Sequence, residues 1–387
     1  MHPVLTFLRH KYIVGAIAAA SALHKITNGK RPKFLFSRNT EIKYVGSKIK
    51  ILEQTEDSVT IAKFNEKGEI DNSDFKIMSA TDLHLDPGEE KANNKSIDRI
   101  VKQVMDNKPD LFIFTGDVIE SDFQQIDCVQ LSWIFEKLGV YFCYTYGNHE
   151  TRESDGYFKY LMLKGLQYYP HCLSKHGKKE LFGYGNCAVH IKNADNTLAK
   201  SIYLFDSGRD MLKCSHEKYG SPKEMDGYDF LKPDQIEWYL NDVKKNKEKY
   251  GGTKTLCYMH IAVPEYEEVF SGTNESGFTP TGKAEILYGE QYETVGCSPY
   301  NSGFFEKATE EGSLQGLFAG HDHINDFCAL YKGIYLTYTQ PSGYSCYSMM
   351  DKFGWPEEKS MHGVTLTTLN SDGSIKIEQK LNNVYLK

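Results

Sequence analysis

The alternation of apolar and polar residues predicts an α/β fold from Phe75 onward. Short apolar runs of the kind found in buried strands alternate with segments whose apolar residues recur at helical spacing. The expected strands are 75–81, 111–116, 140–147, 201–207, 255–260, 314–320, 333–339, 363–369 and 374–380. The expected helices are 95–107, 126–139 and 233–246. This succession is typical of sheets covered by helices.

The same pattern divides the chain into three parts. Residues 1–30 contain an apolar segment at the N-terminus. Residues 31–74 predict a small β extension, because the runs 48–54 and 58–64 have the character of strands and a polar turn separates them. Residues 75–387 are expected to form the main domain, which is long enough to bury a large core.

The N-terminal segment has two interpretations that the sequence leaves open. Arg9, His10 and Lys11 precede an apolar run over 12–23, the layout of a signal peptide or anchor. The run is short for a bilayer span, and the alternative is a helix that packs on the domain. Any membrane association is expected through this segment alone, and the location stays open between the cytoplasm and export.

The net charge bears on the kind of partner that the protein binds, and the cysteine content bears on whether it contains disulfide bonds. The formal net charge is -7 and no basic cluster stands out, so we expect no nucleic-acid partner. The nine cysteines are scattered singly, with no C-x-x-C pair. Reduced thiols are therefore favoured over a disulfide framework.

Polar residues able to bind a metal ion follow five of the expected strands. They are Asp82 with His84, Asp117, Asn148, His260, and His321 with His323. A single polar residue after a strand is an ordinary turn former. Five strands that all end in this way predict one ligand site at the carboxyl edge of the sheet.

These residues resemble the five motifs of the calcineurin-like metallophosphoesterases. The motifs are Asp82-x-His84, Gly116-Asp117, Gly147-Asn148-His149-Glu150, His260 and Gly320-His321-Asp322-His323, in the order of the family. The segments 260–269, 301–327 and 333–344 resemble a branch with plant purple-acid-phosphatase-like proteins and a fungal cell-cycle-regulating phosphatase. The chain has His84 and Glu120 where true purple acid phosphatases have no histidine and a tyrosine. This departure argues against a tyrosinate-ferric centre.

The resemblance implies a four-layer αββα sandwich with two mixed sheets and a dinuclear metal centre. Asp117 is the candidate bridging ligand. Asp82, His84 and His323 are expected to complete one metal position, and Asn148, His260 and His321 the other. These donors suit manganese, iron or zinc, and two such ions acidify a bridging water and clamp phosphoryl oxygens.

The expected activity is that of a phosphohydrolase that acts on phosphate monoesters with a metal-bridging hydroxide. The monoester preference comes from the resemblance alone. A phosphodiesterase with the same core is one alternative, and a non-catalytic binding module of the same fold is another.

His149 is expected to contact the phosphate and to protonate the leaving oxygen, with Glu150 or another carboxylate orienting its imidazole. The alternative is a purely structural histidine beside the site. Asp322, Asn325 and Asp326 are expected to hold the ligand histidines in place.

The segment from Glu265 to Ser302 shows little periodicity and is expected to be a long loop that selects the substrate. Tyr266 and Asn301 are its candidate substrate contacts. The alternative is a surface insertion with no role in substrate selection.

Overall fold

The computed structural model describes residues 40–121, 123–150 and 157–386. The apolar segment 1–30 lies outside these residues. The structure therefore does not decide between a signal peptide and a packed helix. Within the described part of the chain, no helix has both the length and the apolar character needed to cross a bilayer.

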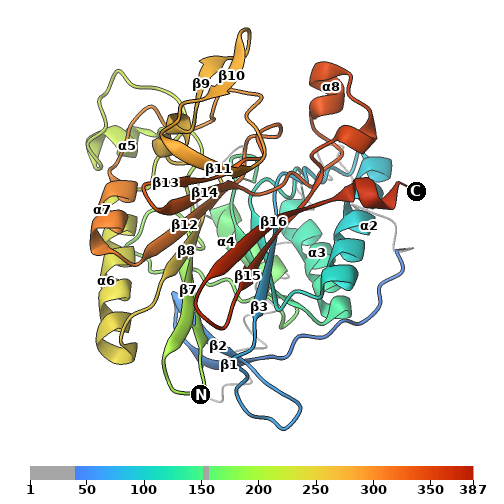
Figure 1. Cartoon of the computed structure of the whole chain (residues 1–387), viewed down its shortest axis with the longest axis vertical. Helices are drawn as coiled ribbons and strands as arrows, with labels where there is room; N and C mark the ends of the chain where they lie inside the picture. The colour runs from blue at the N-terminus through green and yellow to red at the C-terminus, as the bar shows by residue number, and fades with distance from the viewer. Residues whose placement is uncertain (1–39, 122, 151–156, 387) are drawn as a thin grey trace.

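The larger of two central sheets has nine strands of mixed direction (Figure 1). β2 pairs parallel with β6, and β7, β8, β12 and β14 form a run of parallel neighbours, whereas the remaining pairs are antiparallel. In spatial order the strands are β1 (Ile49–Gln54), β2 (Ser58–Lys63), β6 (Cys187–Lys192), β7 (Leu198–Leu204), β8 (Thr255–Tyr258), β12 (Leu314–Ala319), β14 (Ile334–Tyr338), β13 (Cys328–Tyr331) and β11 (Ala284–Tyr288).

The smaller sheet has five strands, of which three neighbours run parallel. In spatial order they are β16 (Ile375–Leu381), β15 (Gly363–Leu369), β3 (Phe75–Ala80), β4 (Leu111–Thr115) and β5 (Tyr141–Thr145). A separate hairpin of β9 (Phe270–Thr273) and β10 (Gly277–Pro280) projects from one end of the molecule (Figure 1).

Helices cover the outer faces of both sheets, which gives the four layers that the resemblance implied (Figure 1). Those beside the smaller sheet are α2 (Glu90–Asn107), α3 (Gln124–Leu138) and α4 (Tyr157–Leu166). Those beside the larger sheet are α6 (Pro233–Tyr250) and α7 (Phe304–Glu311). The short elements are α5 (Lys213–Glu217), α8 (Met349–Phe353), η1 (Pro264–Glu268), η2 (Glu357–Lys359) and η3 (Asn382–Tyr385).

The space between the sheets is filled by apolar side chains from both. Ile77, Leu111 and Ile113 of the smaller sheet share one cluster with Val189 and Ile202 of the larger sheet, and all five are fully buried or nearly so. Burial of this size stabilises the sandwich by roughly 1.5–3 kcal/mol for each large side chain. The two sheets are therefore held in a fixed relation, which matters because each sheet contributes part of the site.

Residues 40–74 are not a separate unit. β1 and β2 continue the edge of the nine-stranded sheet, because β2 pairs with β6. The predicted strands and helices are present, with boundaries shifted by a few residues. The expectation of a long irregular loop from Glu265 to Ser302 is wrong, because β11 within it pairs with β13 in the large sheet.

Candidate metal centre

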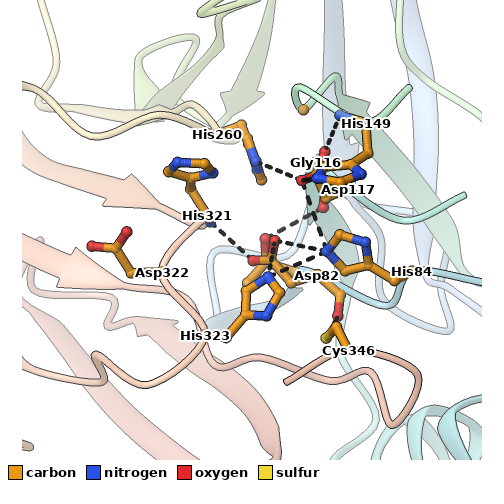
Figure 2. A network of polar contacts seen from close by, with 12 residues as sticks. Asp82, His84, Gly116, Asp117, His149, His260, His321, Asp322, His323 and Cys346 are labelled. Carbon is orange, nitrogen blue, oxygen red and sulfur yellow. Dashed lines mark hydrogen bonds and ion pairs between the residues drawn. The ribbon is translucent and has the colours of Figure 1, made fainter. Parts of the chain in front are cut away.

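The candidate ligands come from strands of both sheets that end at the same edge of the sandwich. Asp82, Asp117 and Asn148 follow the parallel strands β3, β4 and β5 of the smaller sheet. His260 and His321 follow β8 and β12, which are parallel neighbours in the larger sheet. The structure thus brings together side chains that lie far apart in the sequence (Figure 2).

Four of these residues adopt backbone conformations that residues with a side chain rarely take. The φ angles are 53° at Asp82, 44° at His84, 48° at Asp117 and 77° at His321. Such left-handed conformations cost of order 1–3 kcal/mol each and cluster at functional sites. Here the strain turns each side chain back into the site at the point where its strand ends.

Two glycines let the ligand loops approach one another closely. A Cβ atom at Gly116 would lie 2.5 Å from Nδ1 of His260. One at Gly147 would collide with the carboxylate and the backbone nitrogen of Asp117. Glycine at both positions is therefore a steric requirement of the site.

One donor cluster consists of Asp82, His84 and His323 (Figure 2). The Nε2 atoms of the two histidines lie 3.2 Å apart. Oδ1 of Asp82 lies 3.4 Å from Nε2 of His323 and 3.7 Å from Nε2 of His84. This oxygen is fully buried and has no hydrogen-bond partner among the described residues.

The second donor cluster gathers around His260. Its Nε2 lies 2.9 Å from Oδ1 of Asn148 and 3.2 Å from Oδ2 of Asp117. His321 also presents a ring nitrogen to Asp117 and His260, with the three ligand atoms within 4.8 Å of one another. Together these four side chains offer two imidazoles, one carboxylate and one amide oxygen.

The protonation pattern leaves both clusters rich in acceptors. Nδ1 of His84 lies 2.7 Å from a Glu120 oxygen, and Nδ1 of His260 lies 2.8 Å from the Thr115 carbonyl oxygen. Nδ1 of His323 lies 3.3 Å from the carbonyl oxygen of Tyr347. Each Nδ1 therefore donates its proton outward, and each Nε2 lone pair faces carboxylate, amide or imidazole acceptors. These lone pairs and acceptor oxygens repel one another unless a cation or an extra proton lies between them. The donor set therefore fits metal ions.

The pKa shifts at the site indicate the same demand for positive charge. Burial alone would lower the pKa of His260, but the carboxylates of Asp117 and Asp82 raise it to about 9. Burial would raise the pKa of Asp117, yet the neighbouring histidines His260 and His84 hold it below its usual value. Burial and His260 lower the pKa of His321 to about 3, which keeps this imidazole neutral and able to act as a ligand.

Asp117 lies between the two clusters. Its Oδ2 is 3.2 Å from Nε2 of His260 and 3.8 Å from Nε2 of His84. Its Oδ1 accepts a hydrogen bond from the backbone N–H of His149 at 2.8 Å. No other carboxylate among the described residues belongs to donor groups on both sides of the centre.

His149 lies at the rim of the centre, half-buried, with Nε2 3.9 Å from Oδ2 of Asp117. Its Nδ1 lies 3.3 Å from Oε1 of Glu120, whose other oxygen receives the His84 proton. Glu120 thus contacts a candidate ligand and the candidate acid at once. No motif in the sequence predicts this role for Glu120. The one available signal was its position three residues after Asp117, in the same loop.

Of the two alternatives for the group that orients His149, Glu150 or another carboxylate, the structure favours another carboxylate, because Glu120 lies beside the imidazole. The Glu150 carboxylate is instead buried among backbone amides. It accepts hydrogen bonds from the N–H groups of Asp117 at 3.0 Å and Ile119 at 3.2 Å, and from those of Val118 and Gly147. The Tyr144 hydroxyl donates to it at 2.7 Å. Glu150 therefore fixes the loop after β4 against the loop after β5.

Asp322, Asn325 and Asp326 lie beside the ligand histidines but hold a different segment. Asp322 accepts from the Gly296 N–H at 3.0 Å and points away from the centre (Figure 2). Asn325 accepts from the N–H groups of Tyr292 and Glu293, and Asp326 from that of Glu290. Within the described residues none of the three bonds to an imidazole of His321 or His323. Their role in holding the ligand histidines therefore stays a prediction, and the bonds that the structure shows connect these side chains to residues 290–296.

The two predicted substrate contacts have different environments. Tyr266 is 0% exposed, and its hydroxyl donates to the carbonyl oxygens of Leu317 and Thr337. With no exposed surface it cannot contact a substrate, so this prediction is wrong. Asn301 is exposed and donates to Glu265 at 2.8 Å, so its role stays a prediction.

Comparisons with known proteins identify the family of the chain. The sequence profile of the calcineurin-like phosphoesterase family matches residues 75–325. The chain is 27% identical to a probable inactive purple acid phosphatase 14 of Arabidopsis thaliana over 75% of this chain and 77% of that protein. It is 28% identical to phosphatase DCR2 of Saccharomyces cerevisiae over 67% of this chain and 46% of that protein. 

Among solved structures, a dimetal phosphatase from Danio rerio has a TM-score of 0.47 and 13% identity, over 80% of this chain and 96% of that one. The family profile spans more than half of the sequence and includes every strand end that carries a candidate ligand. The chain therefore belongs to the calcineurin-like phosphoesterase family.

Proposed function

We propose that this chain is a metal-dependent phosphohydrolase with a dinuclear centre that cleaves phosphate monoesters. The observation that carries the proposal is the position of Asp117, whose carboxylate faces His84 on one side and His260 on the other. We assign Asp82, His84 and His323 to one metal position, and Asn148, His260 and His321 to the other. Asp117 serves both.

When bound, two metal ions supply an acidified water molecule and neutralise charge on the phosphoryl oxygens. The protein contributes the fixed geometry. Asp82 and Asp117 are fully buried, and the sheets that carry them are locked together by the core between them. Ligands held on strand ends in this way need little reorganisation during the reaction.

His149 is proposed to donate a proton from Nε2 to the leaving oxygen, while Glu120 receives the hydrogen bond from Nδ1 and fixes the ring. Burial lowers the pKa of His149 in spite of the nearby charge of Asp117. A lowered pKa makes the imidazolium a stronger acid, and its protonated form is then most abundant on the acid side of neutrality. Proton donation is worth roughly 10²–10⁴-fold in rate.

The preference for monoesters rests on the relatives, whose names describe phosphatases. A diesterase would use the same core. The net charge of -7 is unfavourable for a polyanionic nucleic acid, so a small or basic phosphate ester is the better substrate class.

The second candidate function is a non-catalytic binding module, which the word "inactive" in the names of three relatives supports. A module that had lost catalysis would be free to lose ligands or the acid. Here each of the expected positions holds a donor, and His149 keeps a carboxylate partner in Glu120. This completeness favours an enzyme.

A rate panel tests the proposal. Protein stripped of metal is reloaded with Mn²⁺, Fe²⁺ or Zn²⁺ and assayed on an aryl phosphate monoester and on the matching diester. We expect hydrolysis that depends on metal, with the monoester preferred at least tenfold in kcat/KM. Preference for the diester would show that the enzyme is a phosphodiesterase. Tight metal binding without turnover of either ester would favour the binding module.

A further inference from the structure

A cysteine lies beside the donor cluster of Asp82, His84 and His323, although none of the five family motifs includes it. One ring nitrogen of His84, one ring nitrogen of His323 and Sγ of Cys346 all lie within 4.8 Å of one another. Cys346 is a free thiol and is partly buried. Figure 2 shows its side chain close to Asp82, on the side where His84 and His323 lie.

The segment that carries Cys346 is held against the centre on both sides. Before the cysteine, the Ser342 N–H donates to the Thr81 carbonyl oxygen at 2.9 Å, and the Ser345 hydroxyl donates to Asn93 at 3.2 Å. After it, the Tyr347 ring stacks on His323 with centroids 4.3 Å apart. The placement of the thiol is thus fixed by its neighbours.

A glycine makes this close approach possible. A Cβ atom at Gly343 would collide with the carbonyl oxygens of Asp82 and Leu83. The chain therefore passes directly over the backbone of a candidate ligand three residues before Cys346. The thiol makes a long hydrogen bond to the Asp82 carbonyl oxygen, at 3.8 Å.

The Asp82 side chain gives a second indication, separate from the thiol, that this donor cluster binds a ligand. Its Oδ1 is fully buried and has no hydrogen-bond partner among the described residues, and it faces Nε2 of both histidines. Since Nδ1 of each histidine is already engaged outward, the corner presents one oxygen and two nitrogens to the same point. Sγ of Cys346 would be a fourth, softer donor.

We propose that Cys346 is a thiolate ligand of the metal ion at the Asp82, His84 and His323 position, and that it makes this position selective for zinc or ferrous iron over manganese. This inference rests on the proposed metal centre, and it specifies which class of metal ion the position binds. Binding forms a metal–sulfur bond, and the thiol proton leaves to solvent.

The distances and the chemistry are compatible with this role. Zinc–sulfur and zinc–nitrogen bonds of about 2.3 Å and 2.0–2.1 Å that meet at a tetrahedral angle place S and N roughly 3.6 Å apart. The three donor atoms lie within 4.8 Å of one another, so ligation requires them to draw closer together. Soft thiolate donors favour zinc and iron, whereas manganese prefers carboxylate, carbonyl and water ligands.

Cobalt substitution tests the proposal without relying on turnover. Metal-free full chain is titrated with Co²⁺ in three forms: wild type, Cys346→Ser, and Cys214→Ser as the control. Cys214 is also a partly buried free cysteine, but it lies on α5, outside the donor groups. Visible d–d absorption reports that cobalt is bound, and near-ultraviolet charge-transfer absorption reports a cobalt–sulfur bond.

We expect wild type and Cys214→Ser to show both absorptions, and Cys346→Ser to keep the visible bands while losing the near-ultraviolet band. In competition titrations, Cys346→Ser should weaken Zn²⁺ binding at least roughly tenfold and leave Mn²⁺ nearly unchanged. Unchanged near-ultraviolet absorption in Cys346→Ser would overturn the thiolate ligand while the metal centre stands. Absence of visible bands in all three forms would overturn the metal centre itself.

Discussion

Nε2 of His260 lies 3.2 Å from Oδ2 of Asp117, although the two residues follow strands of different sheets. His260 comes after β8 of the nine-stranded sheet and Asp117 after β4 of the five-stranded sheet. A metal ion held by both residues would therefore join the two halves of the sandwich at the edge where Asp117 has a left-handed backbone conformation. Metal content and fold stability should be coupled.

Removal of metal should lower the melting temperature. A ligand that binds only the folded chain stabilises it by about 4 kcal/mol when its concentration is a thousand times its Kd. Thermal unfolding is measured on chelator-treated protein with and without added Zn²⁺ or Mn²⁺, and with Ca²⁺ as the control ion. Equal melting temperatures in all samples would contradict a centre that links the sheets.

Substitution of the proposed acid should affect chemistry and spare the metals. His149→Ala is expected to lower kcat by roughly 10²–10⁴-fold on a substrate with a poor leaving group, and by less on an activated aryl ester. Its metal content should match wild type. Equal losses on both substrates would show that His149 binds phosphate without donating a proton.

Glu120→Gln should differ from His149→Ala because Glu120 contacts His84 as well as His149. We expect a smaller, leaving-group-dependent loss in kcat together with metal affinity weakened about 10–100-fold. Metal affinity is measured by competition with a chromophoric chelator. Wild-type affinity in Glu120→Gln would mean that the Glu120 contact to His84 does not support a ligand.

The sequence predicted the fold and the convergence of ligands because both depend on local patterns. Apolar runs mark buried strands, and a polar residue directly after each run marks the functional edge. Glu120 and Cys346 could not be found in this way, since neither follows a strand at a motif position and each approaches the centre through tertiary structure. Tyr266 shows the converse limit: sequence position placed it near the site, and only packing reveals that it is buried.

The β9–β10 hairpin is the part of the segment after Glu265 that can be tested for substrate selection, because its tip is exposed. Replacing residues 272–278 by a short turn leaves β11 and residues 290–296 in place. If the hairpin selects substrates, KM for the natural ester should rise while hydrolysis of a small aryl phosphate stays near wild type. Loss of activity on the small ester, with metals and fold retained, would place the hairpin in the catalytic centre.

His362 should make the fold sensitive to acid. It is buried, stacks on Tyr344 with centroids 4.2 Å apart, and burial together with the Lys95 charge lowers its pKa to about 4. Between its ordinary value of 6.5 and pH 4, the unfolded chain binds a proton that the folded chain refuses. Stability should fall as pH falls through this window, by roughly 3 kcal/mol in total.

Urea unfolding of His362→Gln and wild type between pH 7 and pH 4 measures this contribution. The variant should be less stable at pH 7 but should lose less stability on acidification. Parallel pH dependences in the two proteins would show that His362 does not titrate in this window.

A comparison of Asp117→Asn with Asp110→Asn tests most directly whether Asp117 is shared by two metal ions. Both are buried aspartates at opposite ends of β4, and Asp110 instead accepts from the Lys76 N–H at 2.8 Å and pairs with Lys63. Metal content and aryl phosphate hydrolysis are measured on both folded proteins. A shared carboxylate predicts that Asp117→Asn loses metal and all detectable turnover, while Asp110→Asn keeps both. Two bound metal ions and a near-normal kcat in Asp117→Asn would contradict a carboxylate that both metal ions share.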